Sequence, residues 1–374
     1  MRVVYPLAPT LSGMKLTRLT SDHLRVPFGK PTPIPLTAQR PLMWPDAVDL
    51  LLVNLETDAG IAGLGFAYVL GPGAAAVRSI IDCELSQMIL GEDPRDTDRL
   101  LAKGEERFRG VGFAGIVARA YSALDIALWD VKAKAAGVPL FRLLGNARSA
   151  APFFVSDLAG DVAKAAKPIM KQGALGVRIE IGAGEVQADA ERVREVSDAL
   201  GDDAWVGVAA NSRFDLATAQ ALAHFFEDIG VDWFEDPIPA SDEIGYAKLA
   251  SMMETPLAVG SSFTSRETFF RVIRAGQVRT IRPDLGRIGG ITPFLKIAAV
   301  AEAYQVAVSP VRMPEVGVHL ACGLGVVTSV DSVSWFREVF ASGPRVESGK
   351  IVPPAEAGLG LTLSADAARF RVVR

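Results

Sequence analysis

Polar side chains that could carry out chemistry follow five hydrophobic runs in the middle of this chain. The runs are IEIG, WVGVAANS, WFEDP, LAVGSSF and TIRPDLG, and they occur at regular spacing between segments with helical patterns. Carboxylates in such places can hold a metal ion or transfer protons, and a guanidinium group can bind an anionic substrate. The residues at the ends of the runs are Arg178, Glu180, Ala209, Asn211, Glu235, Asp236, Ser261 and Asp284.

The elements that must position these side chains alternate from about residue 151 onward. Candidate strands are APFFVSD, GVRIEIG, WVGVAAN, WFEDP, LAVGSSF, TIRPDLG, VAVSPV and VTSVDSVSWF, with helical segments between them. These segments begin near Asp161, Gly184, Asp215, Asp242, Ser265, Thr292 and Pro314. Parallel strands need crossover helices, so eight such strands predict a (β/α)8 TIM barrel of the α/β class. In that fold the active site lies at the carboxyl ends of the strands. An open doubly wound sheet is the alternative, which we disfavour because no GxGxxG follows the first strand.

The chain before the barrel has a different organisation. MKLTRLTSDHLRV alternates like a strand, and LLLVNLE and IAGLGFA have the pattern of a hairpin. The intervening stretch FGKPTPIPLTAQRPLMWP is rich in proline and predicts a loop. Helices are predicted in AAAVRSIIDCELSQMIL and at 117–136. We therefore expect an extended or disordered tail at 1–14, an α+β domain at 15–148, the barrel at 149–340, and a segment at 341–374 that packs back on the first domain.

The composition narrows the class of protein. The 374 residues carry a net charge of −4, with 49% hydrophobic and 22% charged residues, so nothing favours binding to nucleic acid or to a membrane surface. No apolar run reaches the ~18 residues of a transmembrane helix. Cys83 and Cys322 are too few for a disulfide framework, which favours a reducing, cytoplasmic location.

Four motifs together resemble the mandelate racemase and muconate lactonizing enzyme branch of the enolase superfamily. They are RAYSALDIALWDVKAKAAGVPLFRLLG at 119–145, WFEDPIP at 233–239, RPDLGRIGGIT at 282–292 and AGLGLTL at 357–363. The resemblance implies that the first domain caps the barrel mouth and that the protein forms a homo-oligomer. It also implies Mg²⁺ held by three carboxylates, with a Lys or His base that removes the proton alpha to a substrate carboxylate.

The motifs transfer to this sequence with several replacements. The resemblance places the three metal ligands at Ala209, Glu235 and Ser261, so that Glu235 alone is an acid. Magnesium needs several hard oxygen ligands, so we predict no firmly bound cofactor. The second lysine of a KxK motif corresponds to Glu180, behind Arg178, and the histidine of the seventh strand falls near Val311. The aspartate that partners this histidine in the family is kept as Asp284.

Two interpretations of the barrel lumen remain open. In the first, Arg178 clamps a substrate carboxylate, and Asp284 or Glu180 transfers the proton. In the second, Arg178 forms ion pairs with Glu180, Glu235 and Asp284 that fill a vacated metal pocket. The further residues that we expect to contact a substrate are Asn211, Ser261, Met43, Trp44 and Tyr68.

The two interpretations correspond to two classes of function. The first is an isomerase or lyase, of racemase, epimerase, cycloisomerase or dehydratase type, that acts on a small carboxylate-bearing molecule. The second is a non-catalytic descendant of such an enzyme that binds a small metabolite or only assembles. The lost bases favour the second class, whereas the retained Glu235 and Asp284 keep the pocket polar; we favour the enzyme.

Overall fold

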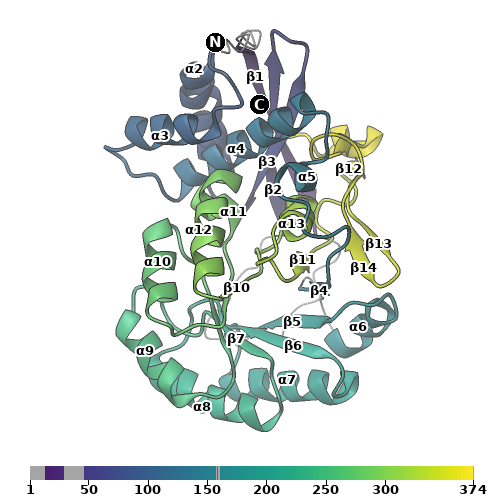
Figure 1. The fold of residues 1–374 in the computed structure, drawn as a ribbon. Helices are drawn as coiled ribbons and strands as arrows, with labels where there is room; N and C mark the ends of the chain where they lie inside the picture. The colour runs from purple at the N-terminus through teal and green to yellow at the C-terminus, as the bar shows by residue number, and fades with distance from the viewer. Residues whose placement is uncertain (1–12, 29–45, 157, 159–160, 374) are drawn as a thin grey trace, which may run out of the picture.

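A computed structural model describes residues 13–28, 46–156, 158 and 161–373 of the chain. Figure 1 shows an antiparallel sheet with its helices at one end of the molecule and a ring of strands and helices at the other. The described chain begins beside the antiparallel sheet and returns to it at its carboxyl end.

The amino-terminal sheet is a three-stranded antiparallel meander. It contains β1 (Leu16–Pro27), β2 (Ala47–Thr57) and β3 (Ala62–Leu70), paired in that order. The predicted hairpin is confirmed, because β2 pairs with β3 from Glu56 opposite Ala62 to Val48 opposite Leu70. Tyr68 lies on β3, so this hairpin brings an aromatic hydroxyl toward the barrel.

Helices cover one face of this sheet. They are α1 (Ala74–Ser79), a π-helical turn at Ile80–Leu85, α2 (Ser86–Ile89), α3 (Thr97–Arg107), α4 (Ile116–Ala135) and α5 (Leu140–Leu143). Two glycines of β3 let α4 approach the strand closely. A Cβ atom on Gly63 would lie 2.5 Å from the carbonyl oxygen of Ala127, and one on Gly65 would lie 2.2 Å from that of Ala123. Glycine at both positions therefore allows α4 to pack closely on β3.

The barrel is a parallel sheet of eight short strands, as predicted. In chain order the strands are β4 (Phe153–Val155), β5 (Gly176–Glu180), β6 (Trp205–Ala209), β7 (Trp233–Glu235), β8 (Leu257–Val259), β9 (Thr280–Ile281), β10 (Ala307–Val308) and β11 (Val330–Ser332). Their spatial order is β10-β9-β8-β7-β6-β5-β4-β11. A parallel bridge between Val308 and Val327 joins the two ends of the sheet, which an open doubly wound sheet would lack.

Helices alternate with these strands. They are α6 (Val162–Met170), α7 (Val186–Leu200), α8 (Leu216–Asp228), α9 (Glu243–Met252), α10 (Arg266–Arg274), α11 (Leu285–Ile288), α12 (Ile291–Ala303) and α13 (Pro314–Gly323). Five of them begin at a side-chain cap that accepts a hydrogen bond from a backbone N–H group of the first turn, at Asp161, Asp215, Asp242, Ser265 and Asp284. The caps at Asp161, Asp215, Asp242 and Ser265 explain why these helix starts could be located from the sequence.

The carboxyl-terminal segment contains short strands and a 3₁₀ helix. The strands are β12 (Phe340–Ser342), β13 (Arg345–Glu347), β14 (Lys350–Val352) and β15 (Thr362–Leu363), and the helix spans Ala365–Phe370. The segment ends against β1, where the N–H group of Val372 donates to the carbonyl oxygen of His23 at 2.8 Å. The domain limits drawn from the sequence stay predictions.

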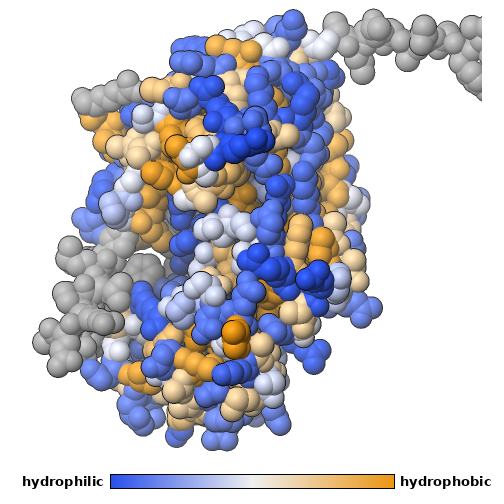
Figure 2. Space-filling model, turned by 90° about the vertical axis from the view of Figure 1, so that its left-hand side faces the viewer, coloured by the Kyte–Doolittle hydropathy of each residue, from blue (hydrophilic) through white to orange (hydrophobic). Residues whose placement is uncertain are grey.

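The surface mixes hydrophilic and hydrophobic residues. On the face shown in Figure 2, hydrophobic residues form small groups between hydrophilic ones. Within the described ranges, no helix is long and apolar enough to cross a membrane.

Candidate functional site

Three predicted site positions form one row at the carboxyl ends of adjacent strands. Glu180 at the end of β5 pairs in register with Ala209 of β6, which pairs in turn with Glu235 of β7. Arg178 lies two residues before Glu180 and therefore faces the same side of the sheet. The structure thus brings Arg178, Glu180 and Glu235 together, as the sequence predicts.

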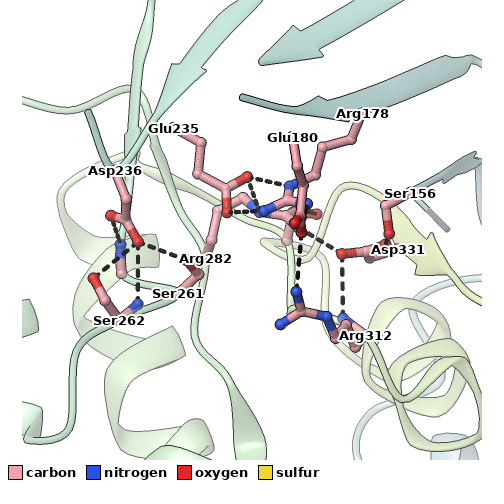
Figure 3. A network of polar contacts seen from close by, with 12 residues as sticks. Ser156, Arg178, Glu180, Glu235, Asp236, Ser261, Ser262, Arg282, Arg312 and Asp331 are labelled. Carbon is pink, nitrogen blue, oxygen red and sulfur yellow. Dashed lines mark hydrogen bonds and ion pairs between the residues drawn. The ribbon is translucent and has the colours of Figure 1, made fainter. Parts of the chain in front are cut away.

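The Arg178 guanidinium lies between the two acids (Figure 3). Its Nε donates to Glu235 Oε2 at 2.7 Å and its Nη2 to Glu235 Oε1 at 2.9 Å, while its Nη1 donates to Glu180 Oε1 at 3.0 Å. Both the Arg178 and Glu235 side chains are buried. Although burial opposes ionisation, the charges of Arg178 and Arg282 lower the pKa of Glu235 to about 2. The pair is therefore a salt bridge in the barrel interior, in which the two oxygens of Glu235 accept from Nε and Nη2 on one edge of the guanidinium.

A second buried arginine extends this network across the barrel. Arg282, just after β9, forms an ion pair with Glu235 at 2.9 Å and donates to Asp331 Oδ2 at 2.6 Å. Its guanidinium also lies over the rings of Phe154 and Trp233, at 5.1 and 4.9 Å from their centroids. Sequence reasoning missed Asp331, although the alternating run VTSVDSVSWF contained its signal.

Arg312 completes the network near the mouth. It follows β10, and its backbone and that of Met313 are left-handed, with φ of 54° and 50°, a conformation that is unusual for such residues. Its N–H group donates to Asp331 Oδ2 at 3.2 Å, and its Nη2 donates to Glu180 Oε1 at 3.1 Å. The guanidinium lies 5.3 Å from the centroid of Trp335. Within the described parts of the chain, its Nε and Nη1 have no hydrogen-bond partner.

Glu180 has one oxygen that is not used by these arginines. Its Oε1 accepts from both Arg178 and Arg312, whereas its Oε2 is buried without a hydrogen-bond partner among the described residues. The side chain is 17% exposed, so it borders the mouth. An acceptor oxygen without a partner can take a hydrogen bond or a proton from a molecule bound beside it.

Asp284 is held apart from the network. Its Oδ2 accepts from the Tyr68 hydroxyl at 2.7 Å, and its Oδ1 accepts from the N–H group of Gly286 at 2.9 Å. The ion pair that it forms is with Arg287, at 3.5 Å. The interpretation in which Asp284 pairs with Arg178 is wrong on this point, because the Asp284 carboxylate caps the short helix α11 and accepts from Tyr68 of β3. Asp331 takes its place in the network. Burial and the Asp284 charge raise the pKa of Tyr68.

Ser261 and its neighbours form a separate cluster. Ser261 Oγ donates to Asp236 Oδ2 at 2.6 Å, and Asp236 also accepts from the N–H group of Gly260 and from both the N–H group and the hydroxyl of Ser262. Burial and the nearby Glu235 charge raise the pKa of Asp236. Asn211 has a left-handed backbone (φ 50°) in the loop after β6. Met43 and Trp44 lie outside the described residues.

The residues at the mouth do not fit a divalent metal ion. Both oxygens of Glu235 face arginine nitrogens, Ala209 has no ligand atom, and the Ser261 hydroxyl is directed to Asp236. In the parts of the chain that the structure describes, no group of three or more His, Cys, Asp or Glu side chains is placed to hold a metal. That the protein holds no firmly bound cofactor stays a prediction.

A hollow of about 530 Å³ lies at the opposite, amino-terminal end of the strands. Phe154, Trp205 and Trp233 line it, with ring centroids 4.3 to 5.6 Å apart. Because Arg282 rests on two of these rings, we interpret the trio as the floor of the buried network, and we place the candidate site at the mouth.

Comparisons with known proteins agree with this architecture. The family model described as Mandelate racemase / muconate lactonizing enzyme, N-terminal domain, matches residues 43–145, and the one described as Enolase C-terminal domain-like matches residues 161–367. L-talarate/galactarate dehydratase from Salmonella typhimurium is 31% identical over 338 residues, covering 89% of this chain and 84% of the relative. The 3,6-anhydro-alpha-L-galactonate cycloisomerase from Streptomyces coelicolor is 26% identical, with 93% and 97% covered.

A solved structure also resembles the whole chain. It is the crystal structure of L-talarate dehydratase from Polaromonas sp. JS666 complexed with Mg and L-glucarate. The TM-score is 0.86 at 30% identity, with 96% of this chain and 97% of that chain covered.

Proposed function

Because this chain belongs to the mandelate racemase and muconate lactonizing enzyme branch of the enolase superfamily, we propose that it is an isomerase or lyase for a small carboxylate-bearing molecule. Its relatives include dehydratases and cycloisomerases named for sugar acids. The substrate class that we propose is therefore a small hydroxy acid of this kind.

The observation that carries the proposal is an acid and a guanidinium at the barrel mouth that both have atoms without a hydrogen-bond partner among the described residues. Glu180 Oε2 is one such atom, and Nε and Nη1 of Arg312, which is bonded to the other oxygen of the same carboxylate, are the others. We assign Arg312 to the substrate carboxylate, because a guanidinium matches that group in shape and charge. Glu180 would then accept the proton alpha to the carboxylate.

The chemistry requires positive charge at this place. A proton alpha to a carboxylate is a very weak acid, and its removal places a second negative charge on the substrate. Arg312, with Arg178 behind Glu180, supplies cationic groups there without a metal ion. Asp284 remains a second candidate for proton transfer, although both of its oxygens already accept hydrogen bonds, from Tyr68 and Gly286.

A specific observation favours the non-catalytic alternative. Arg178, predicted as a substrate clamp, directs its Nε, Nη1 and Nη2 atoms at Glu180 and Glu235, and its side chain is buried. Its role as a clamp stays a prediction. A protein in which Arg312 is also closed to ligands would bind no acid at this site.

Exchange of the alpha proton in D₂O, followed by proton NMR, distinguishes these functions. A pool of sugar acids and other small hydroxy acids would be incubated with the protein, once with Mg²⁺ and once with a chelator. We expect exchange that survives the chelator and is lost in Glu180→Gln, while Glu302→Gln, an exposed acid on α12, retains it. Exchange only with Mg²⁺ would contradict the metal-independent site, and no exchange with any acid would favour the non-catalytic alternative.

The homo-oligomer and the cytoplasmic location stay predictions. Light scattering on the purified chain would give its mass in solution and test the first of them.

A further inference from the structure

The position of the Arg178 guanidinium has a consequence beyond substrate binding. Three of its nitrogens meet three carboxylate oxygens, two on Glu235 and one on Glu180, at 2.7 to 3.0 Å. The side chain is 1% exposed, and the two acids come from strands separated by β6, whose residue in the same row is the small Ala209. A buried cation is thus surrounded by hard oxygen atoms from two strands.

We infer that Arg178 is the built-in cation of this barrel and occupies a cation-binding cavity formed by Glu180 and Glu235. Two carboxylates buried side by side repel each other unless a positive charge lies between them. A divalent ion would meet that need in a site with further oxygen ligands. Here a tethered guanidinium meets it, and its planar shape satisfies the two oxygens of Glu235 at once.

The charge balance of the network supports this inference. Arg178, Arg282 and Arg312 are joined by ion pairs to Glu180, Glu235 and Asp331, so the network has three charges of each sign. Without Arg178, three carboxylates would share two guanidinium groups. One negative charge would be in excess, beside a cavity of guanidinium size, and such a cavity should accept a small cation from solution.

The inference holds whether or not the protein is an enzyme, because it concerns the cation alone. It also predicts that divalent metal ions do not stabilise the wild-type chain, since Arg178 already fills the cavity. Its tests therefore use stability and metal binding, and their failure is distinguishable from failure of the proposed function.

Chemical rescue of Arg178→Ala is the decisive experiment. We expect the variant to unfold at a lower temperature than the wild-type chain, and guanidinium chloride at low millimolar concentration to raise that temperature in a saturable way. Urea, a neutral molecule of nearly the same shape, should not raise it at the same concentration. Arg345→Ala, which removes an exposed arginine paired with Glu347, is the matched control and should show neither loss nor rescue.

A second experiment measures the binding of divalent ions. We expect Mn²⁺, followed by electron paramagnetic resonance, to bind Arg178→Ala but not the wild-type chain, and to be lost again in Arg178→Ala/Glu235→Gln. Wild-type melting unchanged by Mg²⁺ or a chelator would agree with the inference. Mn²⁺ binding to the wild-type chain that disappears in Glu235→Gln would overturn it, as would an Arg178→Ala variant that is as stable as wild type or rescued equally by urea.

The wild-type measurements and Arg178→Lys keep the inference testable if Arg178→Ala does not fold. The lysine retains the charge but cannot bond Glu180 and both oxygens of Glu235 together, so its melting temperature should fall while Mn²⁺ stays excluded. A lysine variant that melts like wild type would overturn the assigned role of the guanidinium.

Discussion

Glu235 and Asp236 are consecutive residues, both fully buried at the end of β7, and yet they lie in opposite surroundings. Glu235 faces Arg178 and Arg282, which lower its pKa to about 2 against the effect of burial. Asp236 faces serine hydroxyls and N–H groups, and burial and the Glu235 charge raise its pKa. Figure 3 shows the two carboxylates pointing to different sides of the strand. Two equally buried carboxylates therefore have pKa values shifted in opposite directions, and the charge of their partners determines the direction.

The partners of Glu235 (the arginine side) and those of Asp236 (the serine side) also differ in how many elements of the barrel they connect. The arginine side joins β5, β7, the turn after β9, the loop after β10 and β11 through long side chains. Among the described residues, the serine side joins β7 to the loop after β8, and Ser212, in the loop after β6, contacts Ser262 at 3.2 Å. A substitution on the arginine side should therefore destabilise contacts across the barrel, whereas a substitution on the serine side should affect only the contacts near it.

Removal of Arg282 should give the largest effect. The variant Arg282→Met would leave Glu235 with one arginine and deprive Asp331 of its 2.6 Å partner, both in the interior. Breaking a buried ion pair from one side costs about 3–5 kcal/mol, and we expect a loss of unfolding free energy in that range. Urea denaturation followed by circular dichroism measures it.

The control for this change is a variant that removes a solvent-exposed arginine. Arg345→Met removes an exposed pair with Glu347 and should change the unfolding free energy by no more than about 0.5 kcal/mol. Equal losses in the two variants would show that the buried network does not act as a unit.

Unfolding measured at different pH values should show that ionisation of the two carboxylates has opposite effects on stability. Because the folded pKa of Glu235, about 2, lies below its usual value of 4.5, its contribution is present above pH 4.5 and is lost as the pH falls toward 2. That contribution is roughly 3 kcal/mol. Asp236 has a raised folded pKa, so its ionisation lowers stability as the pH rises above its usual value of 3.8.

Urea denaturation between pH 2 and pH 7 measures both contributions. Relative to wild type, Glu235→Gln should flatten the rise of stability with pH, and Asp236→Asn should steepen it. The same change of slope in both variants would remove the distinction drawn between the two residues.

The barrel was predictable because its signals are local. Hydrophobic runs of strand length alternate with helical patterns, and the residues Asp215, Asp242 and Ser265 begin helices at the predicted places. Alternation within β5 also placed Arg178 and Glu180 on one side. Each of these inferences needs only residues a few positions apart.

The rest of the ion-pair network needed three-dimensional information. Arg312 reaches Glu180 from 132 positions away, through a left-handed backbone that spacing rules do not anticipate. Asp284 was expected among the arginines, but its carboxylate caps α11 and binds Tyr68, 216 positions away in the sequence. Which acid meets which base depends on side-chain reach across the barrel, and several pairings satisfy the same sequence pattern.

A matched pair of serine variants gives the smallest and finest test of the comparison. Ser261→Ala removes a 2.6 Å hydrogen bond from the buried Asp236, whereas Ser309→Ala removes a 3.0 Å bond from Arg282. The donors to Asp236 among the described residues are all neutral, so losing one should cost about 1.5 kcal/mol of unfolding free energy. Arg282 keeps its ion pairs with Glu235 and Asp331, so losing Ser309 should cost about 0.5 kcal/mol. Urea denaturation at neutral pH resolves this difference. A larger loss in Ser309→Ala would mean that the arginine side depends on its neutral partners as well, and that charge alone does not separate the two regions.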